Sequence, residues 1–109
     1  WDGSGCRSDP SWFGFLLRVS PAAPLSREAL ARRLEAAGIG TRMLFGGNLL
    51  RQPVLAGLRA ERPEALRLAA PADGADQLMR EALFLGTYPG LTAAMLEQML
   101  NAVREAITA

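Results

Sequence analysis

The sequence predicts an α/β fold in two layers, with a small sheet of about three strands and helices packed on one of its faces. Short aromatic and aliphatic runs, typical of strands, alternate with longer segments in which apolar residues recur at helical spacing. The 109 residues suit one domain with a real core and are too few for two. The second face of the sheet, or its edge near Gly46 and Gly47, is left to contact something else.

The first strand is expected at residues 12–19 (WFGFLLRV), after a lead-in at residues 1–11 that has no periodicity. The domain proper is therefore expected at residues 12–109. Aromatic and aliphatic residues fill the run, which predicts a mostly buried strand with core residues Trp12, Phe13 and Phe15. A glycine within it, Gly14, marks a bulge or a close approach of another backbone or a ligand.

Three elements are expected in the middle of the chain. A helix begins after Ser26, a residue type that caps helices, and ends at Gly38. A second strand follows at residues 41–45, and a short helix at residues 54–60 lies behind Pro53. Residues 61–72 carry turn residues and few apolar anchors, so no element is assigned to them.

The last third of the chain predicts a helix, a strand and a final helix. The helix is expected at residues 75–83 with Asp73 as its cap, and the strand at residues 84–86. A Tyr88–Pro89–Gly90 turn then leads to a helix capped by Thr92. The apolar stripe of this last helix predicts a face packed on the core; it comprises Leu96, Met99, Leu100, Val103 and Ile107.

Composition excludes several kinds of chemistry. The net charge is +1, which favours neither nucleic acid nor an anionic membrane as a partner. The twelve basic residues are all arginine, and the chain has no lysine and no histidine. Such a chain cannot form a Schiff base with a cofactor aldehyde, and it lacks the usual general base. The single cysteine, Cys6, excludes an internal disulfide and a multi-cysteine metal site built by this segment alone.

Two features bear on the setting of the chain. No run of residues approaches the length of a membrane span, and no signal segment opens the sequence, so a cytoplasmic setting is expected. The sequence starts at Trp1 and not at methionine, which suggests a piece of a longer polypeptide.

The residues best suited to a ligand lie in the stretch 41–53, TRMLFGGNLLRQP. An apolar strand leads into a double-glycine turn, which is followed by side chains that hydrogen-bond in two directions. Arg42 and Arg51 can each grip a phosphate or carboxylate by two parallel bonds. Asn48 and Gln52 offer donors and an acceptor. The same residues also fit an arginine-bearing surface turn that ends a strand, and residue types alone do not separate the two interpretations.

Three segments, PSWFGFLLRV, GIGTRMLFGGNLLRQP and FLGTYPGLTAAML, occur in an order known from one enzyme family. The chain resembles the C-terminal small domain of the vitamin-B6-dependent sugar enzymes of the DegT/DnrJ/EryC1 type, which have the aspartate aminotransferase fold. Within that family it looks most like the CDP-4-keto-6-deoxyglucose 3-dehydrases of lipopolysaccharide and deoxysugar synthesis. The resemblance covers residues 9–107 and implies a mainly antiparallel sheet, as in the small domain of fold-type I enzymes.

The resemblance implies a division of labour. A larger N-terminal domain holds pyridoxamine or pyridoxal phosphate, a second subunit completes the site, and the 3-dehydrases carry a [2Fe-2S] cluster and work with a separate reductase. The full enzyme removes the C3 hydroxyl of a CDP-4-keto-6-deoxyhexose. This segment, without Lys or His, is then not an enzyme by itself but a lid over the nucleotide sugar, with no catalytic and no metal-binding residue. The residues expected to line the substrate cleft are Arg42, Asn48, Arg51, Gln52 and Tyr88.

Two alternatives stay open. The full protein is an ordinary sugar aminotransferase of the same family if the upstream position that binds the cofactor holds lysine instead of histidine. In the second alternative, the chain is a free-standing, non-catalytic domain whose exposed sheet face drives self-association.

Overall fold

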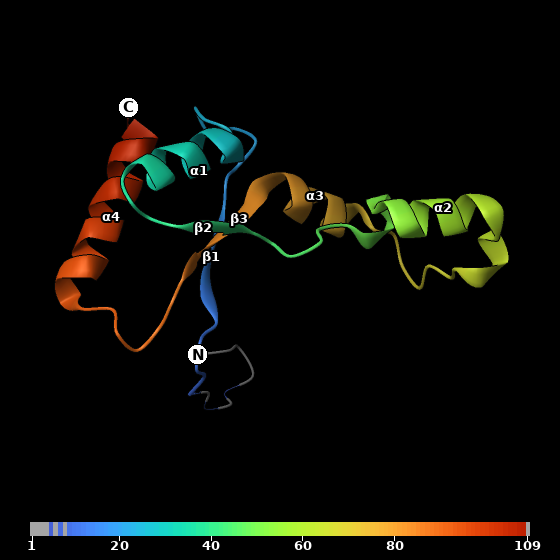
Figure 1. Ribbon diagram of the computed structural model, residues 1–109, viewed down its shortest axis with the longest axis horizontal. Helices are drawn as coiled ribbons and strands as arrows, with labels where there is room; N and C mark the ends of the chain where they lie inside the picture. Colours follow the sequence, from blue (N-terminus) through green and yellow to red (C-terminus); the bar gives the residue numbers. More distant parts are fainter. Residues whose placement is uncertain (1–4, 6, 8, 109) are drawn as a thin grey trace.

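The computed structural model describes residues 5, 7 and 9–108, so Cys6 lies outside the described residues. Figure 1 shows the path of the chain. The elements, in order, are β1 (Gly14–Arg18), α1 (Arg27–Ala36), β2 (Thr41–Met43), the 3₁₀ turn η1 (Leu49–Arg51), α2 (Pro53–Glu61), a second 3₁₀ turn η2 (Pro63–Ala65), α3 (Asp73–Glu81), β3 (Ala82–Gly86) and α4 (Ala93–Thr108).

The sheet has three strands in the order β1–β3–β2, and both outer strands run antiparallel to β3. Residues directly opposite each other on antiparallel strands share a face of the sheet. One face therefore carries the row Leu17–Leu83–Met43, and the other carries the row Leu16–Phe84–Arg42. We call these the inner and the outer face. The predicted fold class is confirmed.

The core lies between the inner face and the helices α1 and α4. Leu34 of α1 and Leu83 of β3 are fully buried there. Local chemistry fixes where α1 begins and ends: the Ser26 hydroxyl accepts a hydrogen bond from the Ala29 amide at 3.2 Å, and Gly38 turns the chain with φ of 78°. The predicted cap and end of this helix are thus confirmed.

Several element boundaries differ from the predictions. β2 ends at Met43 and not at residue 45, because the chain folds back at residues 44–45. α3 begins at Asp73, so this residue lies inside the helix and does not cap it. α3 also ends at Glu81, and β3 starts two residues earlier than predicted, at Ala82. Both residues are buried, Ala82 pairs with β1, and Leu83 pairs with β1 and β2; this burial and pairing favour the strand and outweigh helix propensity.

The prediction that Trp12, Phe13 and Phe15 are core residues is wrong. Their exposed fractions are 57%, 73% and 61%, because the helices leave the outer face and the β1 edge uncovered. Gly14 does mark a close approach, since a Cβ there would lie 2.7 Å from Cδ2 of Phe84. The register from residue 14 to residue 18 is unbroken, so no bulge forms.

The α4 stripe divides into two parts. Met99 and Val103 pack against the core as predicted. The prediction is wrong for Leu96, Leu100 and Ile107, whose side chains are exposed. The apolar surface of α4 is broader than the single face that α1 and the sheet cover.

The chain is elongated. Its radius of gyration is 17.5 Å and its extents are 53 × 38 × 27 Å, whereas a compact domain of this length has a radius of gyration of about 13 Å. In Figure 1, α2 and the segment after it extend away from the sheet beyond α3, and α2 packs on the short turns η1 and η2. None of the described helices is long and apolar enough to cross a membrane.

Candidate functional site

The loop between β2 and η1 folds back tightly. The Phe45 amide donates to the Met43 carbonyl at 2.8 Å, and the Gly47 amide donates to the Leu44 carbonyl at 3.0 Å. Phe45 takes φ of 46°, a left-handed conformation that is uncommon for a bulky residue, and Gly47 takes φ of 60°. The double-glycine segment was expected to serve backbone geometry, and Gly47 does so in the structure.

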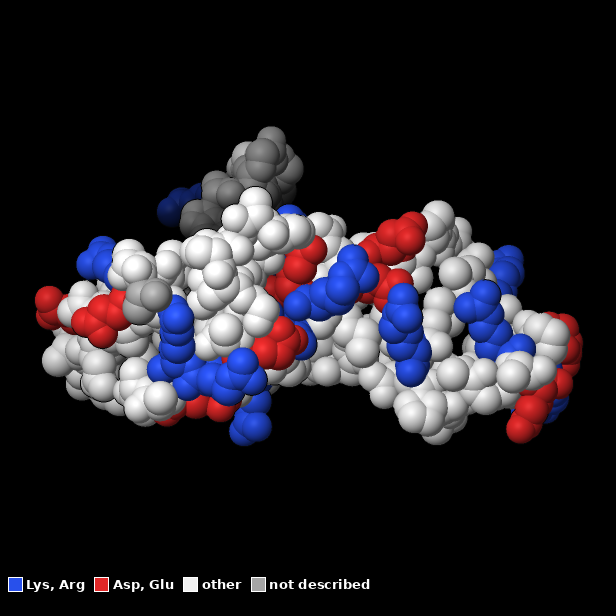
Figure 2. Space-filling model, turned by 90° about the horizontal axis from the view of Figure 1, so that it is seen from above, with Lys and Arg blue, Asp and Glu red and all other residues white. Residues whose placement is uncertain are grey.

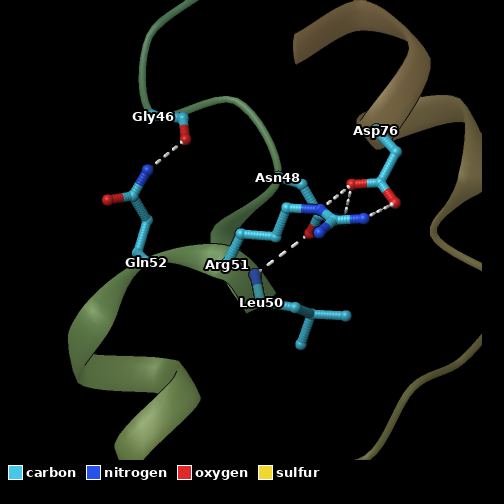
Figure 3. A network of polar contacts seen from close by, with 6 residues as sticks. All are labelled: Gly46, Asn48, Leu50, Arg51, Gln52 and Asp76. Carbon is cyan, nitrogen blue, oxygen red and sulfur yellow. Dashed lines mark hydrogen bonds and ion pairs between the residues drawn. The ribbon is translucent and has the colours of Figure 1, made fainter. Parts of the chain in front are cut away.

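A polar network ties this loop to α3 (Figure 3). Asn48 is buried; its side-chain oxygen accepts from the Leu50 amide at 3.0 Å, and its Nδ2 donates to Asp76 Oδ1 at 2.7 Å. Arg51 grips both carboxylate oxygens of Asp76, with Nη2 2.7 Å from Oδ2. The Arg51 side chain stays more than half exposed in this geometry.

The network also sets the charge state of its members. The hydrogen bond from Arg51, reinforced by that from Asn48, holds the pKa of Asp76 well below its usual range, and the same pairing raises the pKa of Arg51. Gln52 joins the loop from the other side, because its Nε2 donates to the Gly46 carbonyl at 2.6 Å (Figure 3). The side chains of Asn48 and Arg51 thus hold one end of the loop to Asp76 of α3, and the side chain of Gln52 holds the other end at Gly46.

Three phenylalanine rings lie together on the outer face. The Phe45 ring centroid is 6.0 Å from that of Phe13 and 5.7 Å from that of Phe84, and the Phe13–Phe84 distance is 5.6 Å. The fold-back at Phe45 places its ring over the strands, where it stays 75% exposed. Arg42 is directly opposite Phe84 on this face, and no hydrogen bond or ion pair engages its side chain within the described part of the chain. The result is an exposed aromatic surface beside a free cation.

Tyr88 lies away from this loop. β2 has Thr41 opposite Leu85 and Met43 opposite Leu83, so the loop leaves one end of the sheet while Tyr88 follows β3 at the other end. The tyrosine is exposed and lines a shallow cavity of about 330 Å³ with residues of α4 and of the turn after α1. The structure therefore brings Asn48 and Arg51 together, with Gln52 close by, places Arg42 on the adjacent face, and leaves Tyr88 apart.

Sequence reasoning missed two residues of this region. Asp76 organises the network from 25 residues away along the chain, and no local signal in the sequence indicates that contact. Phe45 was interpreted as the last residue of a strand. Its position directly before two glycines was the available signal that the strand ends earlier and that the ring turns onto the sheet.

Charge on the molecule is mixed. In Figure 2 arginine and acidic side chains alternate over the face that is shown, with no extended patch of one sign. No group of three or more metal-ligating side chains forms among the residues that the structure describes. The face that Figure 2 shows therefore carries no broad electrostatic footprint.

We expect Gly47→Ala to destabilise the chain by about 1–3 kcal/mol. An L-residue pays about 1–2 kcal/mol for left-handed backbone, and the new Cβ would lie 2.6 Å from Cγ of Met79. Thermal unfolding followed by circular dichroism measures the change. Gly57→Ala in α2 is the matched control, because its Cβ would meet nothing within 4 Å and alanine favours the helix. Equal melting temperatures for the Gly47 variant and the wild type would contradict the close packing of this loop.

Comparison with known proteins assigns the chain to a family. The sequence model of the DegT/DnrJ/EryC1/StrS aminotransferase family matches residues 4–104. The chain is 36% identical over 99 residues to the lipopolysaccharide biosynthesis protein RfbH of Salmonella typhimurium, covering 91% of this chain and 21% of that protein. It is 38% identical over 98 residues to dTDP-4-dehydro-2,6-dideoxy-D-glucose 3-dehydratase of Saccharopolyspora spinosa, covering 90% of this chain and 20% of that protein.

A solved structure supports the fold. GDP-4-keto-6-deoxymannose-3-dehydratase, crystallised with a trapped PLP-glutamate geminal diamine, matches 88% of this chain and 22% of its own with a TM-score of 0.61 and 23% identity. The chain spans about a fifth of the length of the curated relatives that it matches. Because the family model matches nearly the whole sequence, the chain belongs to the DegT/DnrJ/EryC1/StrS aminotransferase family.

Proposed function

We propose that this chain is the small lid domain of a pyridoxamine-phosphate-dependent nucleotide-sugar 3-dehydrase. The complete enzyme would remove the C3 hydroxyl of a CDP-4-keto-6-deoxyhexose in deoxysugar or lipopolysaccharide synthesis. The chain contributes binding and orientation of the nucleotide sugar, not proton transfer. The observation that carries the proposal is the 38% identity to a 3-dehydratase along 90% of this chain, which includes the whole loop and its anchoring Asp76.

The geometry supports a binding role for the loop and the outer face. A ligand site gains from side chains that are held in place before the ligand arrives, because less conformational freedom is lost on binding. The bonds from Asn48 and Arg51 to Asp76 provide such a hold. Arg42 is the cation that remains available to a diphosphate, and the exposed ring of Phe45 offers a flat surface beside it. Gln52 and Tyr88 are proposed to contact the edges of the same cleft.

The cofactor belongs to the part of the enzyme outside this chain. When bound, pyridoxamine phosphate supplies an amine and an electron-accepting ring. This sequence has no lysine and no histidine, so a residue of either type that acts on that ring would come from outside this chain. A [2Fe-2S] cluster would need cysteines from elsewhere, since the chain has one. A second subunit and a separate reductase are proposed partners of the complete enzyme.

A domain exchange tests the proposal. This chain would replace the matching segment of the Saccharopolyspora spinosa 3-dehydratase, and turnover of dTDP-4-dehydro-2,6-dideoxy-D-glucose would be measured. We expect a chimera that dehydrates the sugar. A chimera that is folded, by circular dichroism and size-exclusion chromatography, and binds the cofactor but has no dehydratase activity would contradict the proposal. Transfer of an amino group from glutamate instead of dehydration would favour the aminotransferase alternative.

In that chimera Arg42→Ala is expected to lower kcat/KM by about tenfold or more, because a charge-assisted bond to a phosphate is lost. Arg59→Ala in α2 is the control, since it removes an equally exposed arginine on the arm that extends away from the sheet. Equal kinetics for the Arg42 and Arg59 variants would remove Arg42 from the site and leave the assignment of the domain intact.

A further inference from the structure

A largely buried arginine lies behind residues 44–52, which we call the candidate loop. Arg27 is the first residue of α1, and only 16% of its side chain is exposed. Its Nη1 donates to the carbonyl of Met79 in the last turn of α3, while its Nε and Nη2 both donate to Glu28 Oε1. Each nitrogen of the guanidinium is therefore engaged within the chain, which points to a role in holding α3 and not in binding a ligand.

The bond to Met79 completes the C-terminal end of α3. The last carbonyls of a helix have no partner within the helix, and α3 passes into β3 without a loop that could supply one. The Val19 amide of the chain after β1 bonds to the Glu81 carbonyl at 2.9 Å. Arg27 supplies the partner for the Met79 carbonyl, and its positive charge suits the negative end of the helix dipole.

The same part of α3 supports the candidate loop. A Cβ on Gly47 would lie 2.6 Å from Cγ of Met79, so these two residues pack directly on each other. Asp76 lies three positions before Met79, on the same face of the helix, and binds the polar side chains of the loop (Figure 3). Arg27, Met79 and residues 43–47 line a common cavity of about 170 Å³. The loop therefore rests on α3, and Arg27 ties α3 to α1.

We propose that Arg27 is a positioning residue of the candidate loop. By holding the C-terminal end of α3 to α1, it sets where residues 44–52 lie relative to the sheet. Leu30 and Leu34 anchor α1 in the core, so this helix gives α3 a fixed support. A loop that is held in place before its ligand arrives loses less conformational freedom on binding. The positioning itself does not require the proposed function, whereas its effect on a nucleotide sugar rests on that function.

α1 contains a matched control near its other end. Arg33, in the last turn of α1, donates to the carbonyl of Ala106 near the C-terminal end of α4. In Figure 1, α1 lies between α4 and α3, so the two arginines make the same kind of bond from one helix to different neighbours. Arg27→Met and Arg33→Met each remove the charge and the donors but keep an unbranched apolar stem.

Amide hydrogen exchange of the 109-residue chain, resolved by residue, tests the proposal without a ligand. Arg27→Met is expected to speed exchange of the Gly47 and Leu50 amides by about tenfold or more, because both amides bond within the loop. Arg33→Met should leave these two amides unchanged. A substitution that merely destabilised the fold would speed exchange in the core of α1 and β3 to the same extent. Arg27→Lys keeps a charged donor and should restore part of the protection.

Unchanged exchange at Gly47 and Leu50 in Arg27→Met would overturn the proposal, and so would equal acceleration in the loop and the core. In the chimera described above, Arg27→Met should raise KM for the sugar several-fold with little change in kcat, because a misplaced loop binds ground state and transition state equally less well. A fall in kcat alone, as from loss of folded enzyme, would contradict a positioning role. An inactive chimera with Arg27 intact would contradict the proposed function, and the exchange experiment would still decide the role of Arg27.

Discussion

Replacing Leu83 by alanine is expected to destabilise the domain by about 2–5 kcal/mol. Leu83 is fully buried at the centre of the inner face, where Leu17 and Met43 flank it on the neighbouring strands. Small domains unfold at a cost of about 5–15 kcal/mol, and an elongated chain with few fully buried side chains belongs at the lower end of that range. A large part of the Leu83→Ala protein should therefore be unfolded at 37 °C.

Urea denaturation followed by circular dichroism measures this effect. Leu16→Ala is the matched control, because it removes the same side chain from the adjacent strand but on the outer face, where the leucine is half exposed. Its expected cost is about 1 kcal/mol or less. Similar midpoints for the two variants would mean that the core does not lie between the inner face and the helices.

Asp76→Ala is expected to lower the melting temperature, because the buried Nδ2 of Asn48 would lose its acceptor. Asp73→Ala is the control on the same helix: that residue is exposed in the first turn, and its loss should cost about 1 kcal/mol or less. Thermal unfolding of the three proteins gives the comparison. Equal melting temperatures for Asp76→Ala and the Asp73→Ala control would show that the network does not fix the loop.

The same network predicts how stability depends on pH. The pKa of Asp76 is lower in the folded chain than in the unfolded one, where a carboxyl of this type titrates near pH 3.9. The ionised folded state therefore binds fewer protons than the unfolded state, and the stabilisation is present above that pH and is lost as the pH falls below it. The difference in melting temperature between wild type and Asp76→Ala should shrink between about pH 5 and pH 2. A difference that grows on acidification would contradict the lowered pKa.

Local signals predicted a large part of this fold. Ser26 and Gly38 mark the ends of α1 because capping and left-handed turns depend on single residue types. The strand boundaries were less accurate because they depend on pairing. Ala82 and Leu83 continue a helical pattern in the sequence, and only their pairing with neighbouring strands makes them part of β3.

Burial was the property that the sequence predicted least well. Phe13 and Phe15 are of core-forming types, yet no element among the residues that the structure describes covers them. The same is true of Leu100 on α4. Apolar residues indicate that a surface becomes buried, but not whether its own chain or another one covers it. The distinction matters for this chain, which spans about a fifth of the length of its relatives.

The residues of the candidate site were predicted, but their hydrogen-bond partners were not. Asn48, Arg51 and Gln52 were singled out by their hydrogen-bonding groups, and the structure shows those groups engaged with Asp76, Leu50 and Gly46 (Figure 3). Sequence spacing could not supply these partners, because the most important of them lies on a helix 25 residues later. Whether the loop also contacts a nucleotide sugar stays a prediction.

That prediction is tested most directly by mapping the amide chemical shifts of the isotope-labelled chain during titration with CDP, with dTDP and GDP in parallel. We expect the largest shift changes at Arg42, Phe45 and residues 46–52, and smaller changes in Arg42→Ala. Changes confined to α4 or the α2 arm, or no changes at millimolar nucleotide, would contradict the account in which this loop and the outer face line the substrate cleft.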